Sequence, residues 1–378
     1  MKLFDVFEKL PVNLVRGNGN YVYDDKYSSY LDLYGGHGVI SIGHSHPHYV
    51  SKVTKQLNSL AFYSNSIENS LQTTLARRIG LLSNYEDYQI FFSNTGAEAN
   101  ENALKIASFH TGRSQVIAFS KSFHGRTSAA VAATDIEALR APINQSDKVV
   151  FMPFNDIDSV RKLLQTNDFC AVIIEAIQGV AGVYVADDLF LRQLQQACTA
   201  TGTLLIVDEI QSGYGRSGKF FSHQYAGIKP DLITVAKGIA NGYPMAATFI
   251  SPLIDAKIGQ LGTTFGGNHL ACAAALAVLD VLEDESLIKN VAEVGAYLMT
   301  ELLKIKGVTA VRGRGLMIGV DFEKPIVRLR HQLLVDEHVF TGYSGNYTLR
   351  LLPALTFTKE LADIFISKLK KVIEHEFC

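Results

Sequence analysis

An acidic side chain directly follows a run of apolar residues in the stretch Leu205-Ile206-Val207-Asp208-Glu209-Ile210-Gln211. A continuous apolar run is typical of a strand buried on both faces of a parallel sheet. In open α/β sheets, ligands bind at the carboxyl ends of the strands, which is where Asp208 stands. An aspartate at this place is also a common helix cap, so Asp208 alone leaves a functional and a structural interpretation open.

A lysine stands at the corresponding place after the next apolar run, which spans 232–235 and leads through Ala236 to Lys237-Gly238. A strand end between two small residues is an unusual place for a solvated charge. The position suits a Schiff base between Lys237 and a carbonyl cofactor. The alternative is an ordinary surface lysine.

Strand-like runs alternate with helical patterns through the middle of the chain. The strand-like runs cover 88–93, 116–119, 170–174, 204–207 and 232–235, and the helical patterns cover 97–109 and 189–201. This alternation predicts an α/β fold with a mostly parallel sheet and helices on both of its faces.

The character of the sequence changes towards the C-terminus. A long helical pattern over 269–305 is followed by strand-like runs at 310–311, 316–320 and 348–351 and by a final helix at 359–375. This pattern predicts a small α+β domain, and the Gly- and Tyr-rich first 45 residues are too few to fold alone. We therefore predict an N-terminal segment, 1–45, that packs with the small domain, a large domain, 46–282, and the small domain, 283–378.

The composition excludes several classes of protein. Of 378 residues, 47% are hydrophobic, which excludes a disordered chain, and 35 basic against 37 acidic residues leave no charge excess to attract nucleic acid or an acidic membrane. The chain contains no apolar run long enough to cross a bilayer and no signal-peptide pattern, so we expect a cytoplasmic protein. Reduced, buried thiols are expected at all of its cysteines, Cys170, Cys198, Cys272 and Cys378.

A literal G-x-G-x-x-G occurs at 213–218. A dinucleotide site needs these glycines to end a strand and open a helix. Here four residues, Asp208 to Gln211, intervene after the strand, and Lys219-Phe220-Phe221 does not resemble a helix start. A nicotinamide or flavin site is therefore the weaker interpretation.

Three histidines, His44, His46 and His48, form an H-x-H-P-H run that could bind a metal. Pro47 disrupts regular geometry, and no cysteine or carboxylate stands nearby in the sequence. We therefore favour a turn held by hydrogen bonds and predict no metal.

Two further stretches lie between predicted strands and helices. In the first, 93–100, Gly96 lets the backbone approach a ligand and the N–H groups of a helix start favour an anion, although Asn94 or Thr95 could be an ordinary cap. The second, Ser122-Phe123-His124-Gly125-Arg126, offers a flat ring and a cation that can hold a carboxylate. A surface arginine beside a core phenylalanine is the alternative there.

Together, a phosphate cradle, a stacking ring, a strand-end Asp208 and a strand-end Lys237 are the parts that pyridoxal phosphate requires. The lysine forms an imine with the cofactor, the aspartate keeps the ring nitrogen protonated, and the aromatic side chain stacks on the ring face. Their order and spacing predict a pyridoxal phosphate enzyme.

The chain resembles the class III aminotransferases of the fold-type-I pyridoxal phosphate enzymes, and within them most of all the acetylornithine and succinylornithine branch. The resemblance rests on Gly43-His44-x-His46-Pro47, 94–100, Phe123-His124-Gly125-Arg126, Asp208-Glu209-Ile210-Gln211, Lys237-Gly238, 263–268 and Leu349-Arg350-Leu351. It implies a large domain with a mostly parallel seven-stranded sheet and a small α+β domain.

The resemblance also implies which residues hold the cofactor: Gly96 and Ala97 at the phosphate, Phe123 on the ring face, Asp208 at the ring nitrogen, Gln211 near the ring hydroxyl, Lys237 at the imine and Thr264 at the phosphate of the neighbouring subunit. Lys237 and Asp208 would be the catalytic residues. The role of Thr264 implies a homodimer with shared active sites.

Substrate contacts are implied at Arg126 and Thr263 for an acylated donor, and at Arg350 for the α-carboxylate of glutamate or 2-oxoglutarate. The sequence departs from the family pattern at Val180, where relatives usually have a glutamate that masks the substrate arginine. It departs again at Pro353-Ala354, where relatives have two prolines.

The implied reaction moves the ω-amino group of N-acylated ornithine, acetyl or succinyl, to 2-oxoglutarate, giving the semialdehyde and glutamate in arginine biosynthesis. Unacylated ornithine, 4-aminobutyrate or another ω-amine is the alternative donor within the class. From other classes, a nicotinamide oxidoreductase and a cofactor-binding scaffold without catalysis remain alternatives.

Overall fold

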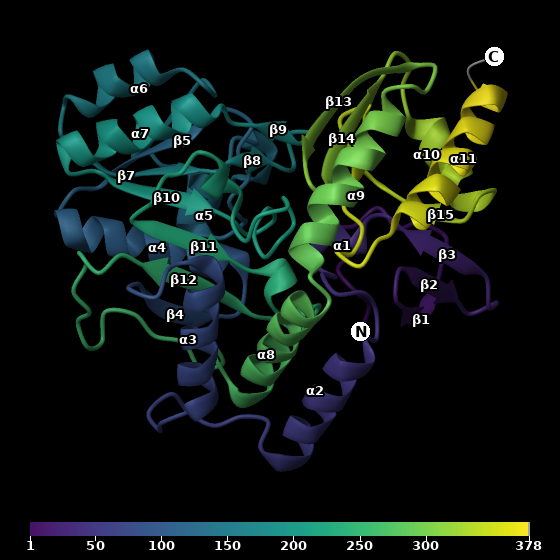
Figure 1. The fold of residues 1–378 in the computed structure, drawn as a ribbon. Coiled ribbons are helices and arrows are strands. Elements are labelled where there is room, and N and C mark those ends of the chain that lie inside the picture. Colours follow the sequence, from purple (N-terminus) through teal and green to yellow (C-terminus); the bar gives the residue numbers. More distant parts are fainter. Residues whose placement is uncertain (377–378) are drawn as a thin grey trace.

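A seven-stranded sheet forms the centre of the larger part of the molecule, in the order β4-β12-β11-β10-β7-β5-β6 (Figure 1). The computed structural model describes residues 1–376, so Cys378 lies outside the described residues. β12 runs antiparallel to both of its neighbours and the other pairs are parallel, which confirms the predicted mostly parallel sheet. The strands are β4 (Gln89–Ser93), β5 (Gln115–Phe119), β6 (Val149–Met152), β7 (Phe169–Ile174), β10 (Leu204–Asp208), β11 (Leu232–Val235) and β12 (Ala246–Ile250).

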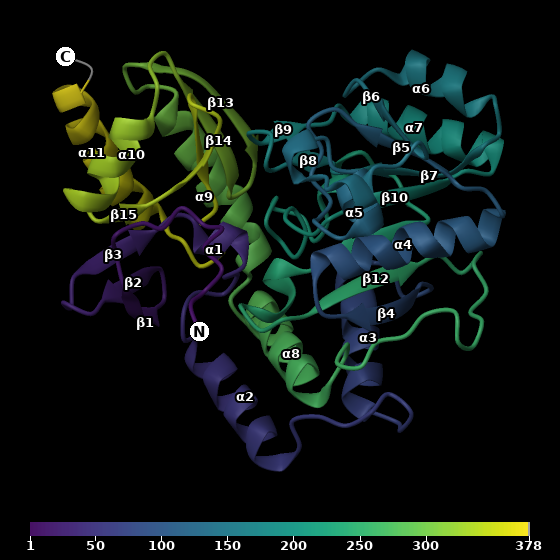
Figure 2. The same cartoon turned by 180° about the vertical axis from the view of Figure 1, so that it is seen from behind.

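Helices cover both faces of this sheet (Figure 2). Val172 packs with α6 (Ile157–Leu164) and α7 (Asp188–Thr201) on one face, whereas its neighbour Ile173 packs with α4 (Gly96–Thr111) on the other. Because the central strands are buried on both faces, their sequences are continuous apolar runs. The predicted α/β class is confirmed.

A smaller antiparallel sheet, in the order β13-β14-β17-β16, forms the C-terminal part. Helix α9 packs on β13 and β14, and α10 packs on α11. These elements are α9 (Leu287–Leu302), β13 (Val308–Arg314), β14 (Met317–Phe322), α10 (Val327–Val335), β16 (Gly342–Ser344), β17 (Thr348–Leu351) and α11 (Lys359–Glu376).

The N-terminal strands β1 (Leu14–Asn18), β2 (Tyr21–Asp24) and β3 (Ser29–Asp32) form an antiparallel sheet. β3 also pairs in parallel with β15 (Val339–Phe340), which lies between α10 and β16. This pairing joins the two ends of the chain beside the smaller sheet (Figure 1). The division into 1–45, 46–282 and 283–378 stays a prediction.

The helical pattern over 269–305 is two helices rather than one, α8 (His269–Asp284) and α9. Ser286 between them has a φ of 51°, in the left-handed region, so the chain cannot continue as a single helix there. The direction of α9 therefore differs from that of α8, and α9 reaches the smaller sheet while α8 stays against the larger part (Figure 1).

The other short elements complete the chain. They are α1 (Gly35–Gly38), α2 (Pro47–Ser59), α3 (Ser70–Ser83), α5 (Ser128–Ala132), β8 (Ile177–Gln178), β9 (Tyr184–Val185) and 3₁₀ turns at Glu137–Leu139, Pro142–Asn144, Ser222–Tyr225 and Lys237–Ala240. Within residues 1–376, none of the helices is both long and apolar enough to cross a membrane. Cys170, Cys198 and Cys272 are buried free thiols.

Candidate active site

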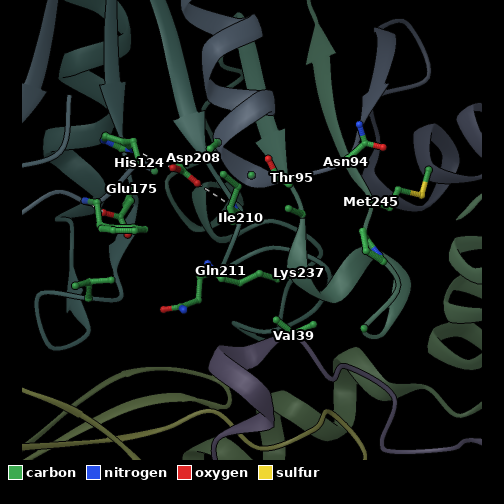
Figure 3. A pocket seen from close by; sticks show the side chains of 18 of the residues that line it. Val39, Asn94, Thr95, His124, Glu175, Asp208, Ile210, Gln211, Lys237 and Met245 are labelled. Atoms are coloured by element: carbon green, nitrogen blue, oxygen red, sulfur yellow. Dashed lines mark hydrogen bonds and ion pairs between the residues drawn. The ribbon is translucent and has the colours of Figure 1, made fainter. Parts of the chain in front are cut away.

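A cavity of about 350 Å³ lies at the carboxyl ends of β10 and β11 (Figure 3). The turn before α4, the loop after β5, the end of β7 and the turn after β11 each contribute to its wall. Of the predicted site residues, the structure brings Gly96, Ala97, Phe123, Asp208, Gln211 and Lys237 together in the lining of this cavity.

The first turn of α4 leaves two backbone donors unused. Thr95 caps the helix, since its Oγ1 accepts the N–H of Glu98 at 3.2 Å, and the Glu98 carboxylate accepts the N–H of Thr95 at 3.0 Å. The N–H groups of Gly96 and Ala97 have no acceptor among the described residues, because the first helical N–H groups lack an intrahelical partner. They are available to a phosphate beside the positive end of the helix dipole.

Close packing behind this turn requires a glycine. A Cβ at Gly96 would lie 2.9 Å from Cδ1 of Ile210. A larger residue would therefore push Ile210, which also lines the cavity, or the turn itself. Capping and phosphate binding, the two interpretations of this stretch, are compatible because they use different N–H groups.

Asp208 is 4% exposed and its carboxylate is held by three donors. Oδ2 accepts hydrogen bonds from Nδ2 of Asn100 at 2.8 Å and, at 2.8 Å, pairs with Nδ1 of His124. Oδ1 accepts the backbone N–H of Ile210 at 3.0 Å. Since Thr234 in turn donates to Oδ1 of Asn100 at 2.7 Å, the orientation of the asparagine is fixed as well.

Lys237 projects into the cavity from a turn in an uncommon backbone conformation, with a φ of 47° (Figure 3). Burial lowers the pKa of Lys237, while the carboxylates of Asp208 and Glu175 oppose that shift and Arg350 adds to it. Within the described part of the chain, its Nζ forms no hydrogen bond or ion pair. A strained residue with an unpaired amine in a cavity indicates a functional group.

Glu175 was not predicted as a site residue, yet it lines the cavity and is buried. Its carboxylate accepts the N–H groups of Phe123 at 2.9 Å and Gly179 at 3.2 Å. Burial raises the pKa of Glu175 to about 7, against the lowering effect of His124. The sequence offered a signal, a carboxylate at the end of a buried strand, but no local pattern showed which side chains surround it.

Arg350 lies on β17 beside the cavity and is 6% exposed. Its Nη1 donates to the carbonyl oxygen of Gly179 at 2.9 Å, and its Nε donates to that of Tyr343 at 2.8 Å. Among the side chains that the structure describes, which end at residue 374, no carboxylate forms an ion pair with Arg350. Val180, which follows Gly179, lines the cavity and brings no charge.

The remaining predicted residues lie at or beyond the edge of the cavity. Oγ1 of Thr263 accepts a hydrogen bond from Nδ2 of Asn94 at 3.3 Å, whereas Thr264 and Arg126 are exposed and do not line the cavity. Gln211, inside it, donates from Nε2 to the carbonyl oxygen of His37 at 3.1 Å, and its buried Oε1 has no partner among the described residues.

The two alternative motifs lie elsewhere. The histidines pair with three different carboxylates, His44 with Asp32 at 2.9 Å, His46 with Glu285 at 3.0 Å and His48 with Asp280 at 2.7 Å. No group of three or more side chains suited to a metal occurs within residues 1–376. The glycine-rich loop at 213–218 follows β10 but does not begin a helix, so it lacks the geometry of a dinucleotide site.

A mostly parallel sheet with an aspartate and a lysine at adjacent strand ends is the arrangement predicted above for a pyridoxal phosphate enzyme. Residues 5–373 match the family model of the class III aminotransferases, and the chain belongs to this family. The predicted enzyme class, a transaminase with pyridoxal 5′-phosphate as cofactor, is thereby confirmed.

Similar proteins cover almost the whole chain. The chain is 37% identical to acetylornithine aminotransferase 1 of Bordetella bronchiseptica, over 98% of this chain and 97% of that one, and 37% identical to acetylornithine aminotransferase of Bacillus subtilis, over 99% and 98%. Its fold is similar to that of ornithine aminotransferase from Toxoplasma gondii, with a TM-score of 0.92, 26% identity and coverage of 98% and 92%. For acetylornithine aminotransferase from Elizabethkingia anophelis the TM-score is 0.85, with 29% identity and coverage of 98% and 95%.

Proposed function

We propose that this enzyme moves the ω-amino group of N-acylated ornithine to 2-oxoglutarate, giving the semialdehyde and glutamate, in the biosynthesis of arginine. The relatives that are 37% identical over nearly their full length are acetylornithine aminotransferases. The observation that carries the proposal is Arg350, a buried cation beside the cavity that no carboxylate of the described residues neutralises. It is open to the α-carboxylate of a substrate, which a guanidinium holds through paired hydrogen bonds.

The residues of the cavity fit pyridoxal phosphate. The unused N–H groups of Gly96 and Ala97 would hold its phosphate, the ring of Phe123 would cover its ring face, and Oδ1 of Asp208 would bind the protonated ring nitrogen. The unpartnered Oε1 of Gln211 would reach the ring hydroxyl. When bound, the cofactor supplies an aldehyde for the amino group and a ring that accepts electrons.

Lys237 has two tasks in this scheme. Its Nζ would hold the cofactor through the aldehyde until the amine of the donor takes that place. The freed Nζ then takes the proton from the amine-bearing carbon of the substrate as a general base and returns it as a general acid. Because burial lowers the pKa of Lys237, the neutral amine that this task requires is favoured.

Asp208 acts through charge and orientation. A buried carboxylate with one oxygen fixed by Asn100 and His124 presents its other oxygen in a constant direction. With the cofactor bound, this oxygen would hold the proton on the ring nitrogen, and the ring would then accept electrons while Lys237 moves the proton.

We also propose a homodimer with shared active sites in the cytoplasm. Helix α2 stands at the edge of the molecule (Figure 1), and although Tyr49 and Val53 pack partly against the core, none of its residues is fully buried. Exposed large apolar side chains gather on α2, on the loop that follows it and on the loop before α8: Val50, Leu57, Leu60, Phe62, Tyr63, Ile67, Leu253, Ile258 and Phe265. A second copy would cover this surface and bring its exposed Thr264 to the phosphate.

An amine-donor panel with 2-oxoglutarate tests the substrate. N-acetylornithine, N-succinylornithine, ornithine and 4-aminobutyrate are each mixed with the holoenzyme, and the change of cofactor absorbance in the first half-reaction is followed. We expect an acylated ornithine to have the highest kcat/KM. Ornithine is the second candidate, because the similar folds include ornithine aminotransferases, and a higher kcat/KM for ornithine or 4-aminobutyrate would overturn the proposal.

A further inference from the structure

The loop at 213–218 carries the G-x-G-x-x-G pattern but takes no part in the cavity. Within it, Arg216 is 2% exposed. Burial lowers the pKa of Arg216 to about 10, and the charge of Asp32 opposes that shift. No carboxylate in the described part of the chain forms an ion pair with Arg216, so its hydrogen bonds must compensate for the loss of water.

Arg216 binds two segments of the smaller sheet at once. Its Nη1 donates to the carbonyl oxygen of Leu316, at 3.2 Å, and to that of Pro353. The backbone carbonyl of Arg216 also accepts the N–H of Leu316 at 3.0 Å. Leu316 immediately precedes β14, and Pro353 follows the last residue of β17 by two positions.

The two carbonyls lie opposite each other in the strand register. β14 and β17 are antiparallel, and Ile318 lies opposite Leu351 at the end of their ladder. If the register is continued by two residues beyond this end, Leu316 lies opposite Pro353. The ladder cannot continue there because proline has no N–H. The guanidinium of Arg216 supplies the missing donor and closes the end of this strand pair.

Close backbone contacts hold the loop at 213–218, helix α9 and the start of β14 together. A Cβ at Gly315 would lie 2.7 Å from the carbonyl oxygen of Arg216 and 2.5 Å from the carbonyl carbon of Ser217. A Cβ at Gly295, on α9, would lie 2.2 Å from the carbonyl oxygen of Gly315. The loop, α9 and the start of β14 therefore meet backbone against backbone, and a displaced loop would displace β14.

Arg350 lies on the strand that Arg216 closes. It faces Gly319 of β14 in the register and stands three residues before Pro353. Farther along, Leu352 donates its N–H to the carbonyl oxygen of Leu33 at 2.7 Å. The position of the Arg350 guanidinium beside the cavity thus depends on how the end of β17 is held.

We infer that Arg216 is a positioning residue for carboxylate recognition: it fixes the β14–β17 pair so that Arg350 meets the α-carboxylate of the keto acid or amino acid substrate. The inference rests on the proposed role of Arg350. The inference assigns a structural role to the glycine-rich loop at 213–218. This loop presents Arg216, and its backbone packs closely against Gly315.

The test uses full-length holoenzyme with Arg216→Gln and Arg216→Lys. Calorimetric titration with glutarate, an unreactive dicarboxylate, reports carboxylate binding without turnover, and steady-state kinetics with varied 2-oxoglutarate give kcat and the Michaelis constant for this keto acid. We expect the Kd for glutarate and the Michaelis constant for the keto acid to rise about tenfold or more, because a small displacement of a binding group weakens recognition strongly. The Kd for the cofactor and kcat at saturation should stay within about twofold of the wild-type values. The Kd for glutarate of Arg216→Lys, which keeps one donor group, should lie between those of wild type and Arg216→Gln.

Two matched variants separate the outcomes. Arg314→Gln removes another arginine, one that links the smaller sheet to helix α7 through its ion pair with Asp188 at 3.0 Å. The Arg314 side chain forms no hydrogen bond with β14 or β17 among the described residues, so this variant leaves glutarate binding unchanged. Arg350→Gln abolishes glutarate binding. If both Arg216 variants bind glutarate as tightly as wild type, or lose cofactor and glutarate affinity equally, the inference about Arg216 is wrong. The proposed role of Arg350 is not affected by that outcome. Unchanged glutarate binding in Arg350→Gln overturns the proposed role of Arg350 and the inference with it. If Arg216→Gln does not fold, the Kd for glutarate of Arg216→Lys alone tests the inference.

Discussion

Nδ1 of His124 lies 2.8 Å from Oδ2 of Asp208, and both side chains are buried. The contact joins the loop after β5 to the end of β10, two strands that are separated by β7 in the sheet. It fixes the carboxylate that, in the proposed mechanism, serves the cofactor ring. This contact supports the proposed catalytic role of Asp208, because a helix cap does not require a link between two strands.

Replacing Asp208 with asparagine keeps the shape of the side chain but removes its charge. The rate constant of the first half-reaction should fall at least about 100-fold, because a preorganised charge in a water-poor site supplies this much stabilisation. Cofactor affinity should change far less. Single-turnover absorbance measurements with cofactor-saturated protein give both values.

The matched control for this variant is Asp231→Asn. Asp231 accepts the N–H of Leu205 at 2.8 Å at the opposite end of the same strands, so it should affect stability and leave the half-reaction unchanged. Unimpaired half-reaction kinetics in a saturated Asp208→Asn protein would contradict the assignment.

Lys237→Ala should stop turnover while the fold and the phosphate contacts remain. Loss of a positioned general base costs about 10²–10⁴-fold, and the loss of covalent attachment adds to that. Borohydride followed by mass spectrometry should fix the cofactor to Lys237 in the wild-type protein and leave the variant unlabelled. Lys219→Ala is the control, because Lys219 donates to the carbonyl oxygen of Gln224 at 3.1 Å outside the cavity. Wild-type turnover by Lys237→Ala would disprove the central assignment.

Leu57→Glu should separate the proposed dimer. Leu57 is exposed on α2, and a charge on an apolar surface that a partner covers opposes association. Sedimentation should then show a monomer with weaker cofactor binding, because Thr264 of a second copy no longer reaches the phosphate. Leu303→Glu, at an equally exposed leucine after α9, should stay dimeric. An active monomer of the unchanged chain would refute the shared site.

Glu209 should make stability depend on pH in the acid range. Burial alone would raise the pKa of Glu209, but hydrogen bonds and charge from His223 and the hydroxyl of Ser212 hold it below its ordinary value of 4.5. A carboxyl group with a lowered pKa in the folded state contributes stability above pH 4.5 and loses it as pH falls through the folded-state pKa.

Glu209→Gln should therefore lower the free energy of unfolding at pH 7 by about 3–5 kcal/mol, the usual effect of removing one partner of a buried pair. The difference from wild type should shrink as the pH is lowered below 4.5. Denaturant titrations at pH 7, 5 and 3.5 measure it, with the exposed Glu323→Gln as control. A difference that stays constant over this range would show that Glu209 does not act through its ionised form.

The residues that the sequence identified are those with a local signal. Asp208 and Lys237 each end a buried apolar run, and Gly96 opens a helix after a strand, so their places followed from periodicity alone. Glu175 also follows a buried apolar run, but neither it nor Asn100 showed in the sequence which side chains surround it. Their roles depend on partners far along the chain, such as the contact between Asn100 and Asp208. Arg216 was part of a motif whose literal form indicated a different cofactor, and only the register of β14 and β17 shows what it binds.

The last prediction concerns Val180 and its position beside Arg350. The carbonyl oxygen of Val180 accepts a hydrogen bond from Oγ of Ser344 at 2.8 Å, and the carbonyl oxygen of the preceding Gly179 accepts one from Nη1 of Arg350 at 2.9 Å. Residue 180 therefore stands next to Arg350, the proposed substrate arginine. As a valine it cannot neutralise Arg350. The open arginine should favour substrates that bring a carboxylate to it, so simple diamines, which have none, should be poor donors. 4-Aminobutyrate, which has one carboxylate but no acylated α-amino group as a second anchor, should be poor as well.

Val180→Glu places a competing acid beside Arg350. The glutamate half-reaction should weaken about tenfold or more, since a hydrogen bond to a charged group contributes about 1.5–3 kcal/mol. The half-reaction with 4-aminobutyrate should weaken less, because this donor does not need the free α-carboxylate site. Val180→Gln, similar in size but uncharged, is the control and should stay within about threefold of wild type for glutamate, because a neutral amide does not neutralise the arginine. An equal effect of glutamate and glutamine at position 180 would mean that size and not charge is responsible, and an unchanged glutamate half-reaction would show that Arg350 does not bind the α-carboxylate from this side.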